Sequence, residues 1–151
     1  MLTESVLAYL HFVAILTLVV FLTSRVTLCR VEWMNASVVR RLPKVDGIYA
    51  IAAIAVLVTG FARTWWGSKG FGWYWSQPLL HIKLGLFVLI GLLSIRPTLA
   101  FQRWRRQLAA SGAMPSEAEV MKVRRWVMVE AHLLVLIPLA AVLLARSVFT
   151  R

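Results

Sequence analysis

Ionisable side chains interrupt the apolar stretches of this sequence at only a few positions. All three histidines lie inside these stretches or at their edges, and several charged residues accompany them: His11, His81, His132, Arg63, Lys83 and Glu130. A charge in a membrane is costly, about 2.5–3.5 kcal/mol on insertion scales, so such residues are functional candidates by default. Imidazole nitrogens ligate iron, and basic groups pair with the propionates of a haem. The residue types therefore indicate binding of a b-type haem or a related porphyrin.

Four long apolar stretches must position these residues. They cover approximately residues 5–29, 47–66, 78–95 and 127–149, and about 20 helical residues cross a hydrocarbon core that is about 30 Å thick. The composition agrees, because 60% of the residues are hydrophobic, 15% are charged and the mean hydropathy is +0.77. We therefore predict an all-α, four-transmembrane-helix bundle that forms a single domain over residues 1–151. Its third and fourth helices extend into the cytoplasm.

The basic residues indicate how the chain is oriented. Of the 17 lysines and arginines, twelve lie in the first and third joints between the apolar stretches, and five lie on the other side. Cytoplasmic loops carry an excess of Lys and Arg, so these two joints are predicted to be cytoplasmic and both termini to face out. The net charge of +11 is thus a topology signal, and nucleic acid is not an expected partner.

The depths of the candidate residues follow from the rise of a helix. At 1.5 Å per residue, His11 lies about 10 Å below the outer surface and His81 about 5 Å below it, with Arg63 and Lys83 at a similar level. We expect His11 to be the best metal ligand, with His81 as a second candidate and the two cations near the propionates. The alternative is that His11 bonds to a polar neighbour, His81 is a wet interfacial residue and Lys83 snorkels outward.

Glu130 and Arg25 lie at a common depth nearer the cytoplasmic side. Opposite charges at one level predict an ion pair between the first and fourth membrane helices. The alternative is a proton-relay role for Glu130. His132 lies about 200° around the helix from Glu130, so the two cannot face the same cleft.

Local signals predict several element boundaries. Asp46 is expected to cap a helix that begins at Gly47, after Pro43 has ended a short interfacial helix within residues 30–44. Ser116 and Glu119 have the spacing of a capping box. The aromatic segment 64–77 is either a belt in the headgroup zone or a lid over an outward-facing pocket.

Several short segments of the sequence resemble a family of small bacterial membrane proteins known as domain of unknown function 2214. They are Ala8-Tyr-Leu-His11-Phe, Lys83-Leu-Gly-Leu-Phe, Gly91-Leu-Leu-Ser-Ile, Pro97-Thr, Phe101 to Trp104, Glu130, Ile137-Pro-Leu-Ala and Ala145-Arg146. That family has no established activity. His11, Lys83 and Glu130 also resemble, more distantly, residues of the oxygen-independent protoporphyrinogen oxidases and the copper-resistance inner-membrane proteins. This second resemblance implies b-type haem binding through the first-helix histidine.

Two functional hypotheses result. The first is a bacterial inner-membrane protein, with both termini in the periplasm, that binds haem b or a porphyrin in the outer half of the bundle for redox chemistry. The second is a cofactor-free accessory or transport protein, for example one that handles copper, in which the same residues line a polar seam. Enzymatic activity stays open. Partners under either hypothesis are the lipid bilayer and either further copies of the chain or a larger membrane complex.

Overall fold

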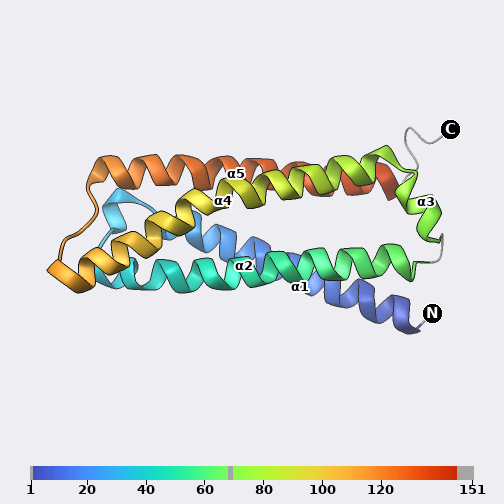
Figure 1. Cartoon of the computed structure of the whole chain (residues 1–151), viewed down its shortest axis with the longest axis horizontal. Coiled ribbons are helices and arrows are strands. Elements are labelled where there is room, and N and C mark those ends of the chain that lie inside the picture. The colour runs from blue at the N-terminus through green and yellow to red at the C-terminus, as the bar shows by residue number, and fades with distance from the viewer. Residues whose placement is uncertain (1, 68–69, 146–151) are drawn as a thin grey trace.

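The chain folds into an elongated bundle of helices that run up and down in turn (Figure 1). A computed structural model describes residues 2–67 and 70–145. The elements are α1 (Leu2–Leu28), the 3₁₀ turn η1 (Val31–Trp33), α2 (Ala36–Trp65), α3 (Phe71–Trp75), α4 (Pro78–Ser111) and α5 (Glu117–Ala145). The described residues contain no strand, and α1, α2, α4 and α5 are each long and apolar enough to cross a membrane. The prediction of an all-α bundle with four membrane helices is confirmed.

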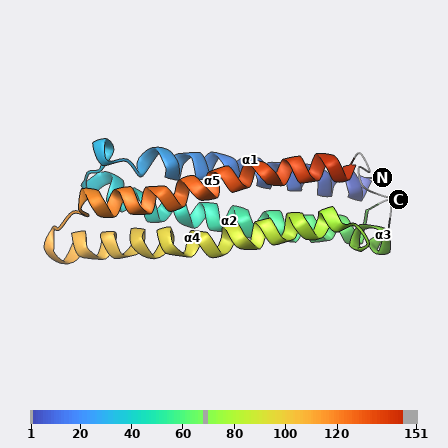
Figure 2. The same ribbon diagram turned by 90° about the horizontal axis from the view of Figure 1, so that it is seen from above.

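The two ends of the bundle differ in what connects the helices. At one end, here called the η1 end, η1 joins α1 to α2 and residues 112–116 join α4 to α5. At the other, the α3 end, α3 leads from α2 into α4, and α1 begins there (Figures 1 and 2). The η1 end is the end that the sequence predicts to be cytoplasmic.

Helix α2 begins earlier than the sequence predicted. It starts at Ala36, where the Asn35 side chain accepts a hydrogen bond from the Val38 N–H at 3.0 Å, and it continues through Pro43. Pro43 therefore does not end a helix, and Asp46 is not an N-cap. A proline can stay inside a membrane-protein helix when neighbouring groups satisfy the backbone that it frees. Asp46 instead lies on a buried face of α2.

Other local signals are confirmed. The Glu119 carboxylate accepts from the Ser116 N–H at 3.1 Å, and the Ser116 hydroxyl accepts from the Glu119 N–H at 3.3 Å, which is the reciprocal pattern of a capping box. Helix α4 ends at Ser111 and is capped by Gly112, whose φ of 70° is left-handed and suits glycine. As predicted, α4 and α5 extend well beyond the apolar stretches at the η1 end, and α2 does so too.

The best-packed region of the bundle lies toward the η1 end. Its largest fully buried apolar side chains are Trp104, Phe101, Leu42, Val39, Val120 and Val127. Arg124 of α5 closes the end of α1, because its Nη1 donates to the carbonyls of Val26 at 3.0 Å and Cys29 at 3.1 Å, which lack helical partners. Many large apolar residues are exposed on the outer faces of the long helices, as a bilayer-embedded surface requires.

Candidate functional site

A cavity of about 740 Å³ opens mainly in the part of the bundle toward the α3 end and extends to Val26 on α1 and Met128 on α5. Residues of α1, α2, α4 and α5 line it together with Trp75 of α3, and nearly all of them are apolar. The polar exceptions include His11 from α1, Arg63 from α2 and Lys83 from α4. The fold therefore brings three of the four predicted cofactor-binding residues to one cavity.

His11 is held by a hydrogen bond to α2. Its Nδ1 lies 2.8 Å from the Thr59 hydroxyl, which itself lies 2.6 Å from the Ala55 carbonyl. The Thr59 hydroxyl has one proton, which it donates to the Ala55 carbonyl. The same hydroxyl must therefore accept a hydrogen bond from His11, so the proton of the neutral imidazole is assigned to Nδ1. Nε2 is then the unprotonated nitrogen, with a lone pair that can ligate a metal or accept a hydrogen bond.

The two cations of the cavity have no counter-charge in its wall. Lys83 is half-buried and Arg63 is exposed, and the lining contains neither aspartate nor glutamate. A low-dielectric wall strengthens the attraction of such cations for an anion. The cavity therefore combines an apolar body with a positively charged region.

His81 does not join this cavity. Its side chain is exposed, and its Nδ1 donates to the Gln77 carbonyl at 3.0 Å, one turn back along α4. The ring packs edge-on against Trp75, with 5.8 Å between centroids. We expected His81 as a second ligand; the structure leaves His11 as the only histidine that lines the cavity.

The aromatic segment divides into two parts. Trp65 and Trp66 are exposed, as residues of an interfacial belt would be. Trp75 instead lines the cavity and stacks on Phe61, another lining residue, with ring centroids 6.2 Å apart. Whether the segment acts as a belt in the headgroup zone or as a lid stays a prediction.

A cluster of buried charges lies in the half of the bundle toward the η1 end. Arg25 of α1 contacts Glu130 of α5 through Nη1 and Oε2 at 3.0 Å, and Asp46 of α2 through Nε and Oδ1 at 3.0 Å. All three side chains are almost completely buried. We call Arg25, Asp46 and Glu130 the charge triad. It holds three helices together, because one guanidinium serves two carboxylates.

Aromatic rings surround the guanidinium of the charge triad. Arg25 Cζ lies 4.3 Å from the centroid of the Tyr49 ring and 5.8 Å from that of Phe101. Such cation–π contacts favour the charged arginine where water is excluded. The contact between Arg25 and Glu130 is the one that their common depth predicted, whereas its role as an ion pair or as part of a proton relay stays a prediction.

His132 points away from the charge triad. It is exposed on α5, and its Nδ1 donates to the Met128 carbonyl at 2.6 Å. Glu130 is completely buried, so the two side chains face different directions, as their angular separation on the helix requires.

Cys29 is the single cysteine of the sequence, and it is completely buried just beyond α1. Burial raises the pKa of its thiol to about 11. A thiol that stays protonated is a poor nucleophile and a poor metal ligand. Cys29 is therefore a packing residue.

Sequence reasoning missed Asp46, Thr59 and Gly60. Asp46 could have been found from the buried positions Val39, Leu42, Asp46 and Tyr49, whose spacing of three and four residues continues one helical face through Pro43. Thr59 and Gly60 gave no comparable signal, because small and hydroxylated residues are common in membrane helices. Gly60 leaves room for His11: a Cβ at this position would lie 3.3 Å from His11 Cε1.

No group of three or more His, Cys, Asp or Glu side chains that could hold a metal ion occurs within residues 2–67 and 70–145.

Comparison with known proteins identifies the family but no activity. Residues 3–148 match the model of a family described as predicted membrane protein, DUF2214. The chain belongs to this family. No significant match was found among curated proteins or among solved structures. The comparisons give no support to the more distant resemblance to the oxidases and copper-resistance proteins.

Proposed function

We propose that the cavity binds a membrane-soluble amphipathic anion, and that this ligand is a b-type haem or a porphyrin. The observation that carries the proposal is the combination, in one cavity, of an apolar wall, one histidine and two cations without an acidic neighbour. A cavity of about 740 Å³ lies within the range of small-molecule sites, about 300–1,000 Å³.

The rim of the cavity favours entry from the bilayer. Val19 of α1 and Val135 and Val142 of α5 all line the cavity, yet 44%, 68% and 55% of their surfaces are exposed. These faces contact lipid in a membrane-spanning bundle. A ligand dissolved in the bilayer can therefore reach the cavity between α1 and α5 without passing through water.

The residues present fit a haem held by one histidine and two cations. His11 would ligate the iron through Nε2, because the hydrogen bond to Thr59 fixes the Nδ1–H tautomer. A hydrogen bond from the non-ligating nitrogen is how proteins commonly orient a ligating imidazole. Arg63 and Lys83 would pair with the propionates. A bound haem would supply one-electron redox chemistry. The protein would hold it, orient it and keep water from its apolar face.

An absorption spectrum of the purified protein tests the proposal. We expect a Soret band and, after reduction, an α band. His11→Ala should abolish them, whereas His132→Ala should leave most of the absorbance, because His132 is exposed and does not line the cavity. Arg63→Gln with Lys83→Gln should weaken haem retention while leaving the residual spectrum unchanged in shape.

A different set of results would overturn the proposal. If the folded protein stays colourless after growth with excess haem and after addition of hemin in detergent, it binds no haem. A cofactor-free accessory or transport role would then replace the first hypothesis. Loss of the spectrum in His132→Ala rather than in His11→Ala would relocate the site.

The same proposal includes the location of the site. We place the chain in the bacterial inner membrane with the α3 end facing the periplasm, because twelve of the 17 basic residues lie in the half of the bundle toward the η1 end. A phosphatase that is active only in the periplasm should be active when fused after Arg151. Activity of a cytoplasm-specific reporter at that position would reverse the orientation.

A further inference from the structure

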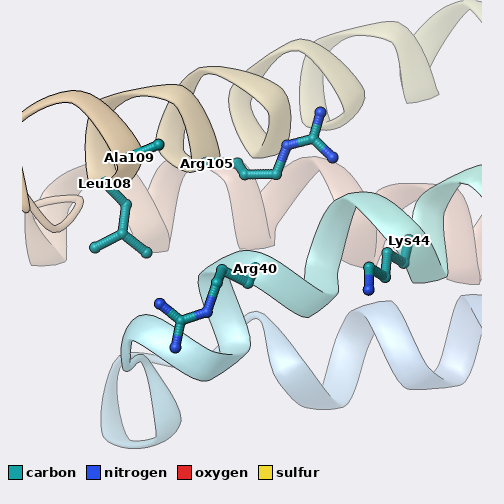
Figure 3. A pocket seen from close by; sticks show the side chains of 5 residues that line it. All are labelled: Arg40, Lys44, Arg105, Leu108 and Ala109. Carbon is teal, nitrogen blue, oxygen red and sulfur yellow. The ribbon is translucent and has the colours of Figure 1, made fainter.

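A second pocket lies between α2 and α4 at the η1 end (Figure 3). Its volume is about 270 Å³, and five residues line it: Arg40 and Lys44 from α2, and Arg105, Leu108 and Ala109 from α4. We call it the basic cradle. Arg40 and Lys44 are one helical turn apart on α2, and Figure 3 shows Arg105 on the facing helix.

Several other basic residues of the same half have protein partners, whereas the cations of the basic cradle have none among the described residues. Arg25 pairs with two carboxylates, Arg103 with Glu119 at 3.0 Å, Arg124 with two carbonyls, and Arg96 lies 4.4 Å from the Trp126 ring. No acidic side chain lines the cradle, and no ion pair links its cations to another described residue. Three positively charged side chains thus line one hollow, and no described acidic side chain pairs with them.

The residues that α2 contributes to the cradle lie near the headgroup zone. Lys44 lies about 5 Å, and Arg40 about 10 Å, before the apolar stretch that begins at Gly47. The polar zone on each side of the hydrocarbon core is about 5–8 Å thick, and long basic side chains reach several ångströms along a helix. Leu108 and Ala109 add a small apolar wall beside the charges.

We propose that the basic cradle binds the phosphate headgroup of an anionic phospholipid in the leaflet at the η1 end. Arg40 and Arg105 would hold the phosphate from opposite helices by charge-assisted hydrogen bonds, and Lys44 would add charge nearest the core. A bound lipid would join α2 to α4. This proposal does not depend on a ligand in the cavity at the α3 end.

Titration with lipid tests the proposal. The full-length protein, in phosphatidylcholine nanodiscs with 0 or about 30% phosphatidylglycerol, is compared with the variant R40Q/K44Q/R105Q by native mass spectrometry and thermal unfolding. Each cation near an anionic surface contributes roughly a fivefold factor in affinity. The triple variant should therefore lose retained phosphatidylglycerol by on the order of 10- to 100-fold, together with its stabilisation by that lipid.

A matched variant separates the cradle from general positive charge. R41Q/R106Q/K122Q removes the same number and types of cation from exposed positions of the same half that do not line the cradle. It should keep the retained lipid. Equal loss in both variants would overturn the proposal in favour of diffuse attraction. The proposal would also be overturned if glycerol phosphate, at matched ionic strength, stabilised the wild-type protein as well as phosphatidylglycerol does.

Discussion

The η1 half of the bundle is tightly packed around a buried charge triad, whereas the α3 half surrounds a cavity with unpaired cations. In the η1 half, Arg25 has two carboxylate partners, and Phe101 and Trp104 are completely buried. In the α3 half, Lys83 and Arg63 line the cavity of about 740 Å³, whose wall contains no acidic residue. The same four helices thus form both regions.

This difference indicates that the two halves of the bundle have different roles. Buried charges that satisfy one another fix the relative positions of the helices, because a slip of one helix would leave a charge unpaired in low dielectric. Charges that lack partners remain available for a ligand. We infer that the η1 half is the rigid frame and that the α3 half is the part adapted to bind.

The largest effect is expected from removing the centre of the charge triad. Arg25→Met leaves two buried carboxylates without their cation, so it should lower the free energy of unfolding by at least the roughly 3–5 kcal/mol typical of a broken buried pair. Glu130→Gln should lower it less, because Asp46 still pairs with Arg25. Denaturant unfolding in detergent micelles measures both.

Combination variants provide the control for this prediction. R25M/D46N/E130Q, which removes all three charges, should be more stable than R25M alone, because no charge is left unpaired. The exposed pair of Arg103 and Glu119, whose side chains are 56% and 41% exposed, should contribute only about 0–1 kcal/mol. Additive losses within the triad would show that its members do not interact and would favour a proton-handling role for Glu130.

A second comparison concerns two phenylalanines. Phe101 is completely buried in the η1 half, so Phe101→Ala should cost about 3–5 kcal/mol. Phe61 lines the cavity and is 45% exposed, so Phe61→Ala should cost less: about 0.5–1.5 kcal/mol for its stacking on Trp75, plus the loss of its smaller buried area. Thermal unfolding of both variants tests the difference. Equal losses would mean that the α3 half is as tightly packed as the η1 half.

The smallest effect is expected at Gly60. An alanine Cβ there would lie 3.3 Å from His11 Cε1, so the imidazole must shift slightly. The helix gains about 0.5–1 kcal/mol when alanine replaces an interior glycine, and crowding offsets this gain. Gly85→Ala, whose Cβ meets nothing within 4 Å, should show the full gain. If the two variants have the same melting temperature and the same haem affinity, the position of His11 does not limit binding.

The sequence predicted most of the architecture because hydropathy and charge act over single helices. Four apolar stretches require four spans, and His11, Leu18, Leu22 and Arg25, whose spacing places them on one face of α1, are buried. The start of α2 was predicted wrongly. Pro43 and Asp46 normally mark helix boundaries, and only packing against α1 shows that Asp46 is an ion-pair partner.

By itself, the sequence determined that this chain has four helices long and apolar enough to span a membrane and that His11, Lys83, Arg25 and Glu130 lie within or beside them. Helical rise alone gives their depths. The tertiary structure decided which of them meet: His11 lines a cavity with Lys83 and Arg63, whereas His81 and His132 point outward. The physical reason is that rotation of a helix about its axis selects its neighbours, and this rotation is set by packing among all four helices rather than by the pattern of any one.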